Sequence, residues 1–229
     1  MTIFLPALGG LAALLLWAAI GLPSFGHYRG PYGFVVAKTV PAERHMSNVV
    51  NGTVFDVRGV DTMGEELILF AAVIGVALLL RQPERRPRSD PERDAVRHGG
   101  ALLVGAAVLV GIWLVAFGFV TPGGGFQGGV AIAAGALLLY VAAGHRGWTR
   151  FGDERLLDPA DALGAGGYAV IGLAALVAGM PFLANMLGGG VTGTLESGGT
   201  AAFVNWAAGI EVAAANLVLF TEFLREYGR

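Results

Sequence analysis

Glu211 is a carboxylate inside a long apolar run of this 229-residue sequence. It lies about 13 Å beyond Ala202, at 1.5 Å per residue along a helix, and therefore near the middle of the run. A carboxyl group at that depth must be protonated, paired or hydrated. No basic residue lies within another apolar run. The sequence leaves open what satisfies this carboxyl group. It can be a proton, a charged residue of a partner subunit, or a hydrogen bond to Asn205, to Asn216 or to another helix.

A cluster of charged residues precedes a shorter apolar run. The cluster comprises Asp56, Arg58, Asp61, Glu65 and Glu66. Carboxylates held at a membrane edge beside other charges can take up and release protons, so these side chains are candidates for the mouth of a proton or cation path. The alternative is structural, because Thr62 followed by Glu65 fits a capping box and acidic residues suit the positive end of a helix dipole.

A glycine-rich turn joins two further apolar runs with almost no loop between them. Its central residues are Pro122, Gly123, Gly124, Gly125 and Phe126. Successive glycines permit positive φ values. The small-xxx-small spacing of Gly124 with Gly128, and of Gly125 with Gly129, also lets two helix backbones approach closely. The turn predicts tight helix packing, with a backbone that lines an ion-containing cavity as the alternative.

Several other kinds of chemistry are excluded or disfavoured. The sequence has no cysteine, which removes disulfides, thiolate nucleophiles, iron–sulfur clusters and Cys-ligated zinc. The four histidines are scattered in or beside predicted loops. The segment 188–199 lacks the Lys-Ser/Thr ending of a phosphate loop and is interpreted as a folded turn. We expect no cofactor, no metal site, no catalytic residue and no nucleic acid partner.

The elements that position these residues are predicted to be membrane helices. Hydrophobic residues make up 55% of the chain and charged residues 14%, with a mean hydropathy of +0.64, whereas soluble proteins are typically about 25% charged. Apolar runs long enough to cross a bilayer cover residues 3–22, 99–119, 126–144, 163–183 and 203–224. A sixth run, 67–80, is long enough only if its helix extends over 62–81. The prediction is an all-α polytopic membrane protein with six transmembrane helices.

The distribution of basic residues predicts the orientation of these helices. Eleven Lys and Arg residues lie in the segment 81–97, the segment 145–162 and the C-terminus, whereas four lie in the first loop. Because positively charged loops stay on the cytoplasmic side, both termini are expected in the cytoplasm.

A linker rich in Pro, Arg and acidic residues divides the chain into two predicted modules. Such a composition can neither enter the membrane nor pack a core. We predict a two-helix module at 1–82, a charged cytoplasmic linker at 83–98 and a four-helix module at 99–229.

Two parts of the sequence resemble known antiporter subunits. The segments 121–129, 193–200 and 208–215 resemble the MnhB family, the B subunits of the Mrp multisubunit cation/proton antiporters, and this resemblance runs from about residue 99 to the end. The segment 56–65, Asp-Val-Arg-Gly-Val-Asp-Thr-Met-Gly-Glu, is similar to the C-terminal end of the Mrp A subunit and to a small subunit of membrane-bound hydrogenases. Val60 stands where those proteins carry an aromatic residue. The chain thus resembles the tail of an Mrp A subunit fused to an Mrp B subunit.

The resemblance implies a function and assigns residues to it. By resemblance, Asp56, Arg58, Asp61 and Glu65 match the motif of the Mrp A subunit, Pro122 and Phe126 the glycine turn, and Glu211 the charge of the last span. Complexes of this kind exchange Na⁺, or K⁺ or Li⁺, for H⁺ across the plasma (inner) membrane. The chain is expected to be an accessory subunit that, with other Mrp-type subunits, helps form or pack a cation path. Two alternatives stay open: a purely structural scaffold, and a membrane subunit of a redox-driven ion pump such as a membrane-bound hydrogenase.

Overall fold

The computed structural model describes residues 4–22, 30–80, 94–148 and 152–227. All regular structure in these residues is helical. The elements are α1 (Phe4–Ile20), α2 (Tyr32–Glu43), α3 (Val49–Gly52), the π-helix η1 (Thr53–Val57), α4 (Gly59–Leu80), α5 (Asp94–Ala116), α6 (Gly125–Trp148), α7 (Glu154–Val177) and α8 (Thr200–Tyr227). The prediction of an all-α fold is confirmed for the described residues.

The chain forms two compact units, residues 1–35 and residues 36–229. The first unit contains α1, an uncharged helix of 17 residues. At 1.5 Å per residue this helix is about 26 Å long. It covers most of the first predicted span, 3–22.

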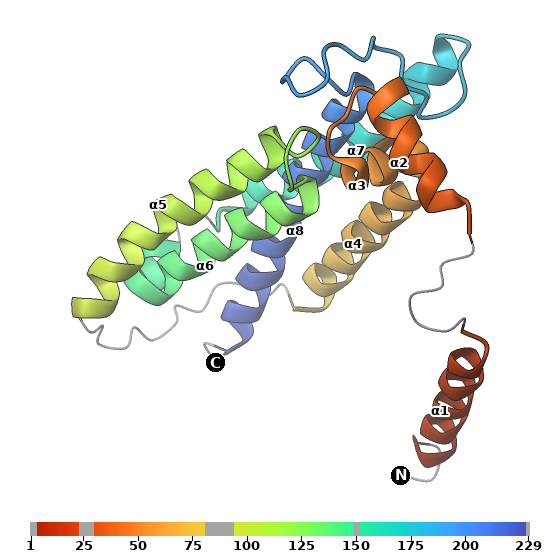
Figure 1. Ribbon diagram of the computed structural model, residues 1–229. Helices are drawn as coiled ribbons and strands as arrows, with labels where there is room; N and C mark the ends of the chain where they lie inside the picture. Colours follow the sequence, from red (N-terminus) through yellow and green to blue (C-terminus); the bar gives the residue numbers. More distant parts are fainter. Residues whose placement is uncertain (1–3, 23–29, 81–93, 149–151, 228–229) are drawn as a thin grey trace. The chain divides into compact units, whose positions relative to one another are not determined.

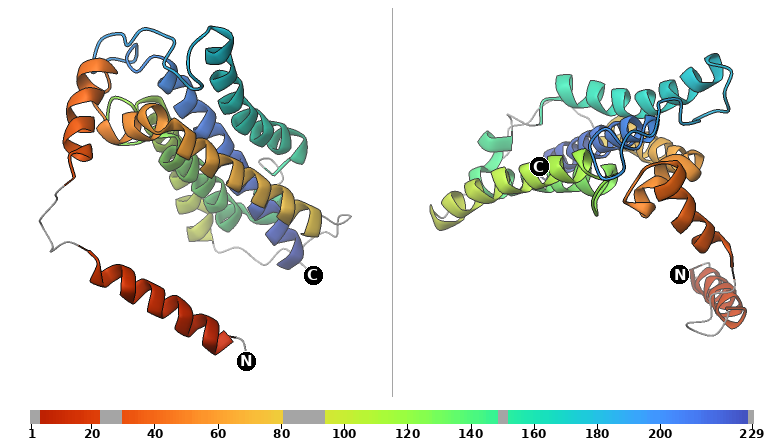
Figure 2. Two further views of the ribbon diagram at one scale, coloured as in Figure 1. Left: turned by 90° about the vertical axis from the view of Figure 1, so that its right-hand side faces the viewer. Right: turned by 45° about the horizontal axis from the view of Figure 1, so that its top comes forward.

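The second unit is a bundle built around α8 (Figure 1). Helices α5 and α6 run side by side as a hairpin, and α6, α7 and α4 each pack against α8 (Figure 2). In the most apolar stretch of α8, 67% of the residues are buried, against 11% for α4. The last helix is therefore the centre of the bundle, whereas α4 keeps most of its surface free for lipid or other chains.

Small residues bring α6 into close contact with its neighbours. A Cβ atom on Gly125 would lie 2.4 Å from the carbonyl oxygen of Asn205, and one on Gly129 would lie 2.8 Å from Cβ of Val212. On the other side of α6, a Cβ atom on Gly128 would lie 2.3 Å from the Val115 side chain. Because no larger residue fits these positions, α6 packs with its backbone nearly against those of α5 and α8.

Four of the described helices are long and apolar enough to cross a membrane. They are α4, the part of α6 up to Gly144, α7 and α8, and α5 contains a shorter apolar stretch, Leu102–Ala116. At Gly144 the backbone has a φ of 59°, which interrupts the helix and ends the apolar part of α6. The chain is a multi-pass membrane protein.

The beginning of α4 differs from the sequence expectation. The helix starts at Gly59, and the region before it, expected to be a loop, contains α2, α3 and η1. Thr62 lies inside the helix, is 2% exposed, and donates a hydrogen bond from Oγ1 to the carbonyl oxygen of Val54. The capping box of Thr62 with Glu65 is therefore wrong, because the π-helix leads almost directly into α4 and leaves no helix start at Thr62.

The beginning of α7 also differs. The sequence placed residues up to 162 in a cytoplasmic loop and expected a span over 163–183, but α7 starts at Glu154. The side chain of Asp153 accepts a hydrogen bond from the backbone N–H of Arg155 and caps the helix. The predicted linker 83–98 lies largely outside the described residues, and its last part belongs to α5.

Candidate functional site: a layer of buried carboxylates

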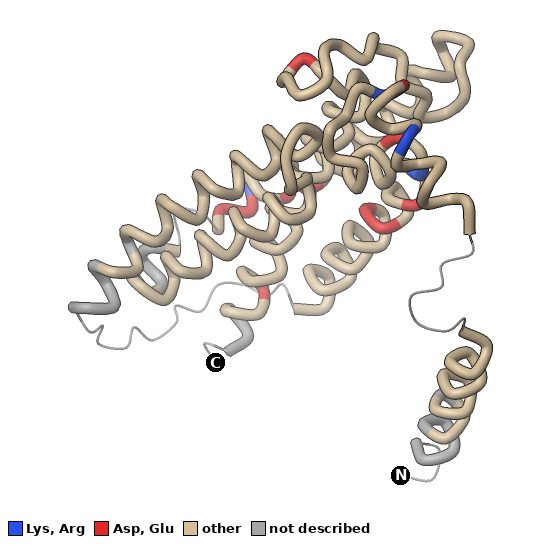
Figure 3. Tube along the Cα trace, viewed as in Figure 1, with Lys and Arg blue, Asp and Glu red and all other residues tan. Residues whose placement is uncertain are grey.

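A buried carboxylate pair lies between α4 and α8. Glu66 is 1% exposed and Glu211 is 0% exposed, and their carboxyl groups interact directly, side chain to side chain. Helix α7 closes the site from a third side, because a Cβ atom on Gly164 would lie 2.5 Å from both N and Cβ of Glu211. Figure 3 shows acidic residues on α4 and α8 within the bundle, in addition to those in the loops.

No hydrogen-bond donor of the described residues satisfies this pair. All four carboxyl oxygens of Glu66 and Glu211 are buried without a hydrogen-bonding partner that donates to them. Asn205 donates to the carbonyl oxygen of Val115, and Asn216 donates to that of Val212. The alternative in which Glu211 forms a hydrogen bond with Asn205 or Asn216 is therefore wrong. The amide groups are already used elsewhere.

A third buried acid, Asp161 of α7, extends the pair into a row. Asp161 is 3% exposed, and its Oδ1 has no hydrogen-bond partner among the described residues. It is close enough to Glu211 and to Asp158 for electrostatic repulsion with both. From the end of the bundle where α4 and α8 begin, Glu66 lies about 10 Å along its helix and Glu211 about 16 Å. Asp161 lies about 24 Å along α7 from Val177, so the three acids follow one another through the bundle.

The row separates two hydrophobic clusters. One cluster contains Tyr168 and Ala208, and the other contains Val73, Leu157 and Ala215. On each of the three helices, the buried acid lies between residues of the first cluster and residues of the second. The acids therefore form a polar layer inside an apolar bundle, where an uncompensated charge is expensive.

The charge of this layer has no basic partner in the part of the chain that the structure describes. The ion pairs of Arg44 with Asp56 and of Arg58 with Asp61 lie near the start of α4, away from the layer. Nor do the described residues hold a group of three or more His, Asp or Glu side chains arranged to bind a metal ion. The layer can instead hold protons, or a single monovalent cation between the two facing carboxylates, as its counter-charge.

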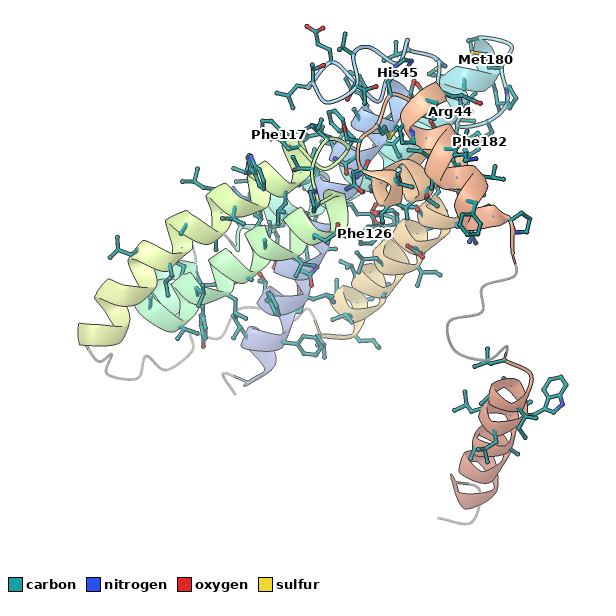
Figure 4. All side chains as sticks on the ribbon, in the orientation of Figure 1. Arg44, His45, Phe117, Phe126, Met180 and Phe182 are labelled. Atoms are coloured by element: carbon teal, nitrogen blue, oxygen red, sulfur yellow. The ribbon has the colours of Figure 1, made fainter. Side chains whose placement is uncertain are left out.

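Three of the charged residues expected at the mouth of an ion path surround the start of α4: Asp56, Arg58 and Asp61. Asp56 accepts from Asn185 and pairs with Arg44, each at 3.3 Å. Arg58 pairs with Asp61, and both are exposed. Asp56 is part of η1, and π-helical turns often occur at functional sites. Figure 4 shows Arg44 and His45 at the end of α2, in the same region as Phe182.

Glu65, a fourth charged residue expected at the mouth of the path, points away from the buried layer. It is exposed on α4, whereas the adjacent Glu66 is buried. The charge pattern alone left both glutamates open, and the resemblance to the Mrp A subunit assigned Glu65. The packing of α4 against α8 buries Glu66 instead. The expected ion-path residues thus fall into two sets: Asp56, Arg58, Asp61 and Glu65 near the start of α4, and Glu66 and Glu211 in the buried layer.

The glycine turn is fastened to two other elements. The side-chain amide of Asn48 donates to the carbonyl oxygens of Gly118, Thr121 and Gly123 at 2.7, 3.0 and 3.3 Å. Figure 4 shows Phe126 on the first turn of α6, where it packs against the first hydrophobic cluster. Pro122 is exposed, whereas Gly124 and Gly125 are buried.

Asn205 of α8 joins this turn to α3. Its Oδ1 accepts hydrogen bonds at 2.8 Å from Nδ2 of Asn51 and from the backbone N–H of Gly125, and its Nδ2 donates to the carbonyl oxygen of Val115, also at 2.8 Å. A single buried amide therefore connects α3, α5, α6 and α8. The sequence identified Asn205 only as one of several helix-to-helix contacts.

The second half of the chain matches one family. Residues 95–218, more than half of the chain, match the domain described as related to the MnhB subunit of Na⁺/H⁺ antiporter. The chain belongs to the MnhB family. The resemblance found in the glycine turn and in the last helix is thereby confirmed, whereas the MnhB match does not extend to the first 94 residues.

Curated relatives of this MnhB-family chain match it over part of their length. A protein of Methanocaldococcus jannaschii without an assigned function is 34% identical over 157 residues, which are 60% of each chain. A probable K⁺/H⁺ antiporter A/B subunit of Rhizobium meliloti is 34% identical over 139 residues, 48% of this chain and 13% of the relative. The matches thus span 60% and 13% of these two proteins.

Two solved structures share the fold. A chain of the membrane-bound sulfane sulfur reductase, an archaeal respiratory membrane complex, superimposes with a TM-score of 0.77 and 29% identity, over 98% of this chain and 99% of that chain. The Mrp complex from Dietzia sp. DQ12-45-1b contains a chain with a TM-score of 0.70 and 23% identity, matched over 98% of this chain and 26% of that one. The second likeness shows the fold alone.

Proposed function

We propose that this MnhB-family chain is an accessory membrane subunit of a multisubunit antiporter in the plasma membrane, which exchanges Na⁺ or another monovalent cation for H⁺. Other Mrp-type subunits are its partners. The observation that carries the proposal is the buried pair of Glu66 and Glu211, which has no donor and no basic residue beside it among the described residues. A membrane helix retains such a costly pair where an ion or proton must pass.

The six spans predicted from the sequence, with both termini in the cytoplasm, belong to this proposal. So does the division into a tail like that of the Mrp A subunit at 1–82, a linker at 83–98 and an MnhB-like module at 99–229. In this arrangement, the start of α4 faces the outer side and the start of α7 faces the cytoplasm. Asp56, Arg58, Asp61 and Glu65 then surround the outer end of the carboxylate row.

Glu65 has a separate place in the proposal. Because α4 is largely exposed and Glu65 lies on its exposed face, this carboxylate is available to a neighbouring subunit rather than to the buried row. A basic or hydrated group of a partner would then continue the ion path from this chain into the next.

Flux measurements on the whole complex test the role of the buried pair. Glu66→Gln and Glu211→Gln, each in a complex that still assembles, should lower Na⁺- or K⁺-dependent H⁺ flux in membrane vesicles about tenfold or more. Glu196→Gln is the matched control, because Glu196 is exposed in the connection between α7 and α8. Normal flux in both variants would refute the role of the pair, but not the family membership.

A purely structural role predicts a different pattern. If the chain only fills a gap between larger subunits, Glu211→Gln leaves both assembly and flux unchanged. Gly124→Leu disrupts assembly instead, because a side chain on Gly124 would meet Gln127 at 2.8 Å and Asn51 at 3.2 Å. The two variants together separate the scaffold from the ion path.

The second candidate function is a membrane subunit of a redox-driven complex. The match to a chain of an archaeal respiratory membrane complex favours it, because that match runs almost from end to end in both chains. Purification through a tag on this chain, followed by mass spectrometry of what stays bound, distinguishes the two. Antiporter-like subunits without metalloproteins support the antiporter, and cofactor-bearing redox subunits support the alternative.

A further inference from the structure

A cavity of about 450 Å³ lies beside the carboxylate row, between α4, α7 and α8. Its wall includes Val73, Ile74 and Leu78 of α4 and Asp158, Asp161 and Ala162 of α7. The volume is large enough for several water molecules, since each occupies about 30 Å³ in the liquid. All the polar side chains of the wall are thus carboxylates of α7.

Asp161 connects this cavity with the buried row. Its side chain lines the cavity, only 3% of the residue is exposed, and Oδ1 has no hydrogen-bond partner among the described residues. A buried carboxylate oxygen without a donor is stable only if water, a proton or a cation reaches it. The cavity supplies the space for water at that oxygen.

The mouth of the cavity lies where α7 begins and α4 ends. Leu78 is two residues from the end of α4 and is 80% exposed, and Asp158 lies about 6 Å along α7 from Glu154. Ile74, one turn of α4 further inside, is still 42% exposed. The exposed residues of the wall therefore lie toward the end of the bundle where α4 ends and α7 begins, and the buried Asp161 lies deeper, toward Glu66 and Glu211.

We propose that this cavity is an aqueous inlet that gives protons access to Asp161 from the side of the membrane on which α7 begins. A hydronium ion in the cavity transfers its proton to the carboxylate of Asp161 and leaves a water molecule behind. Release toward the cavity is the reverse step. The proposal that the proton passes on to Glu211 and Glu66 rests on the proposed function. The proposal that water fills the cavity is independent of it.

Thiol labelling of single-cysteine variants tests the inlet directly, because the natural chain has no cysteine. Ala162→Cys places a thiol on the cavity wall, and Leu163→Cys places one at the same depth of α7 but outside the wall, on a side chain that is 72% exposed. A second pair on α4 is Val73→Cys on the wall and Ala72→Cys outside it. The complex stays in its membrane, and labelling by a charged, membrane-impermeant maleimide is read as a mass shift of this chain.

The inlet predicts that the two wall cysteines react at least tenfold faster than their controls. In the orientation proposed above, this reaction occurs in inverted vesicles, which expose the cytoplasmic side, and not in right-side-out vesicles. Equal rates at wall and control positions, or no labelling of the wall from either side, would overturn the inlet. The second result would mean that lipid or a partner helix fills the cavity.

Flux measurements separate this inference from the proposed function. Asp161→Asn should lower H⁺ flux about as strongly as Glu211→Gln if the inlet feeds the buried pair. If the wall cysteines are labelled but flux is normal in the Glu66→Gln and Glu211→Gln variants, the inlet is supported and the ion path is refuted. Unlabelled wall cysteines with reduced flux in those variants would keep the ion path and refute the inlet.

Discussion

Replacing Asn205 by alanine should destabilise the bundle more than replacing any other asparagine of α8. The side chain makes three hydrogen bonds, to Asn51, Gly125 and Val115, each at 2.8 Å, and the residue is 0% exposed. Side-chain hydrogen bonds in membrane proteins contribute about 0.6 kcal/mol each on average, so their loss alone costs about 2 kcal/mol. The substitution also leaves the Gly125 N–H and the Asn51 amide buried without this acceptor. We therefore expect Asn205→Ala to lower the free energy of unfolding by about 2–4 kcal/mol in total.

Asn216→Ala is the matched control for this prediction. It lies on the same helix, is partly buried, and makes one hydrogen bond, to the carbonyl oxygen of Val212 in its own helix. The control should therefore cost less than about 1 kcal/mol. Both variants replace an asparagine by alanine. They differ in that Asn205 connects four helices, whereas Asn216 forms its hydrogen bond within α8.

The assay is the temperature at which the tagged chain is lost from the detergent-solubilised complex. For a chain of this size, 1 kcal/mol corresponds to about 2–4 °C, so Asn205→Ala should lower the midpoint by roughly 5–15 °C and Asn216→Ala by less than about 4 °C. Midpoints that agree within about 1 °C would show that the amide of Asn205 does not hold the four elements together.

Three further substitutions test the packing around the carboxylate layer, and two substitutions of Arg44 test the ion pair near the start of α4. Gly164→Ala should separate α7 from α8 and cost about 2 kcal/mol or more, because its Cβ would lie 2.5 Å from the backbone nitrogen of Glu211 in α8. Gly166→Ala, which meets nothing within 4 Å, should be neutral or stabilise α7 by up to about 1 kcal/mol in the same thermal assay. Tyr168→Phe removes the 2.9 Å hydrogen bond from Oη to the first carbonyl oxygen of α4 and should lower stability by about 1 kcal/mol, measured as a lower melting midpoint. Arg44→Ala leaves the largely buried Asp56 without its cation, so it should lower the midpoint by a few degrees, and Arg44→Lys should lower it less.

The sequence predicted the kind of fold and the position of Glu211 along its helix, but not the partners of Glu211. Mean hydropathy and apolar runs identify membrane helices because a bilayer demands about 20 apolar residues per span. The position of Glu211 near the middle of α8 follows from counting residues along one helix. Its contact with Glu66 depends on how α4 packs against α8, which lies more than a hundred residues further along the chain.

Asp161 could not be found by the same reasoning. It follows a segment that is rich in charged residues and has a proline two positions earlier, and such a composition is typical of a loop. The structure places Pro159 inside α7, in its second turn, and Asp161 after it. A signal was nevertheless present. Residues 157, 161, 164, 165 and 168 recur at helical spacing, and all of them are buried in α7.

The glycine turn illustrates the opposite case. Its spacing predicted close helix contacts from the sequence, since only small residues allow two backbones to touch. The structure places Gly125 and Gly129 against α8, and Gly128 against α5. The sequence does not show which residues of α6 face which residues of α8. In the structure, the hydrogen bond from the N–H of Gly125 to Oδ1 of Asn205 belongs to this alignment.

The Asn205 junction and the carboxylate layer lie on the same helix, and this placement bears on the choice between scaffold and ion path. Asn205 and Glu211 are about 9 Å apart along α8. The first is satisfied by three hydrogen bonds, and the second has none among the described residues. A helix that served packing alone would gain stability from an apolar residue in place of Glu211, because a buried pair of carboxyls costs more than well-packed hydrophobic side chains. The bundle satisfies its amide and leaves its acids open to protons or cations, which is the difference expected between a residue that holds the fold and residues that serve transport.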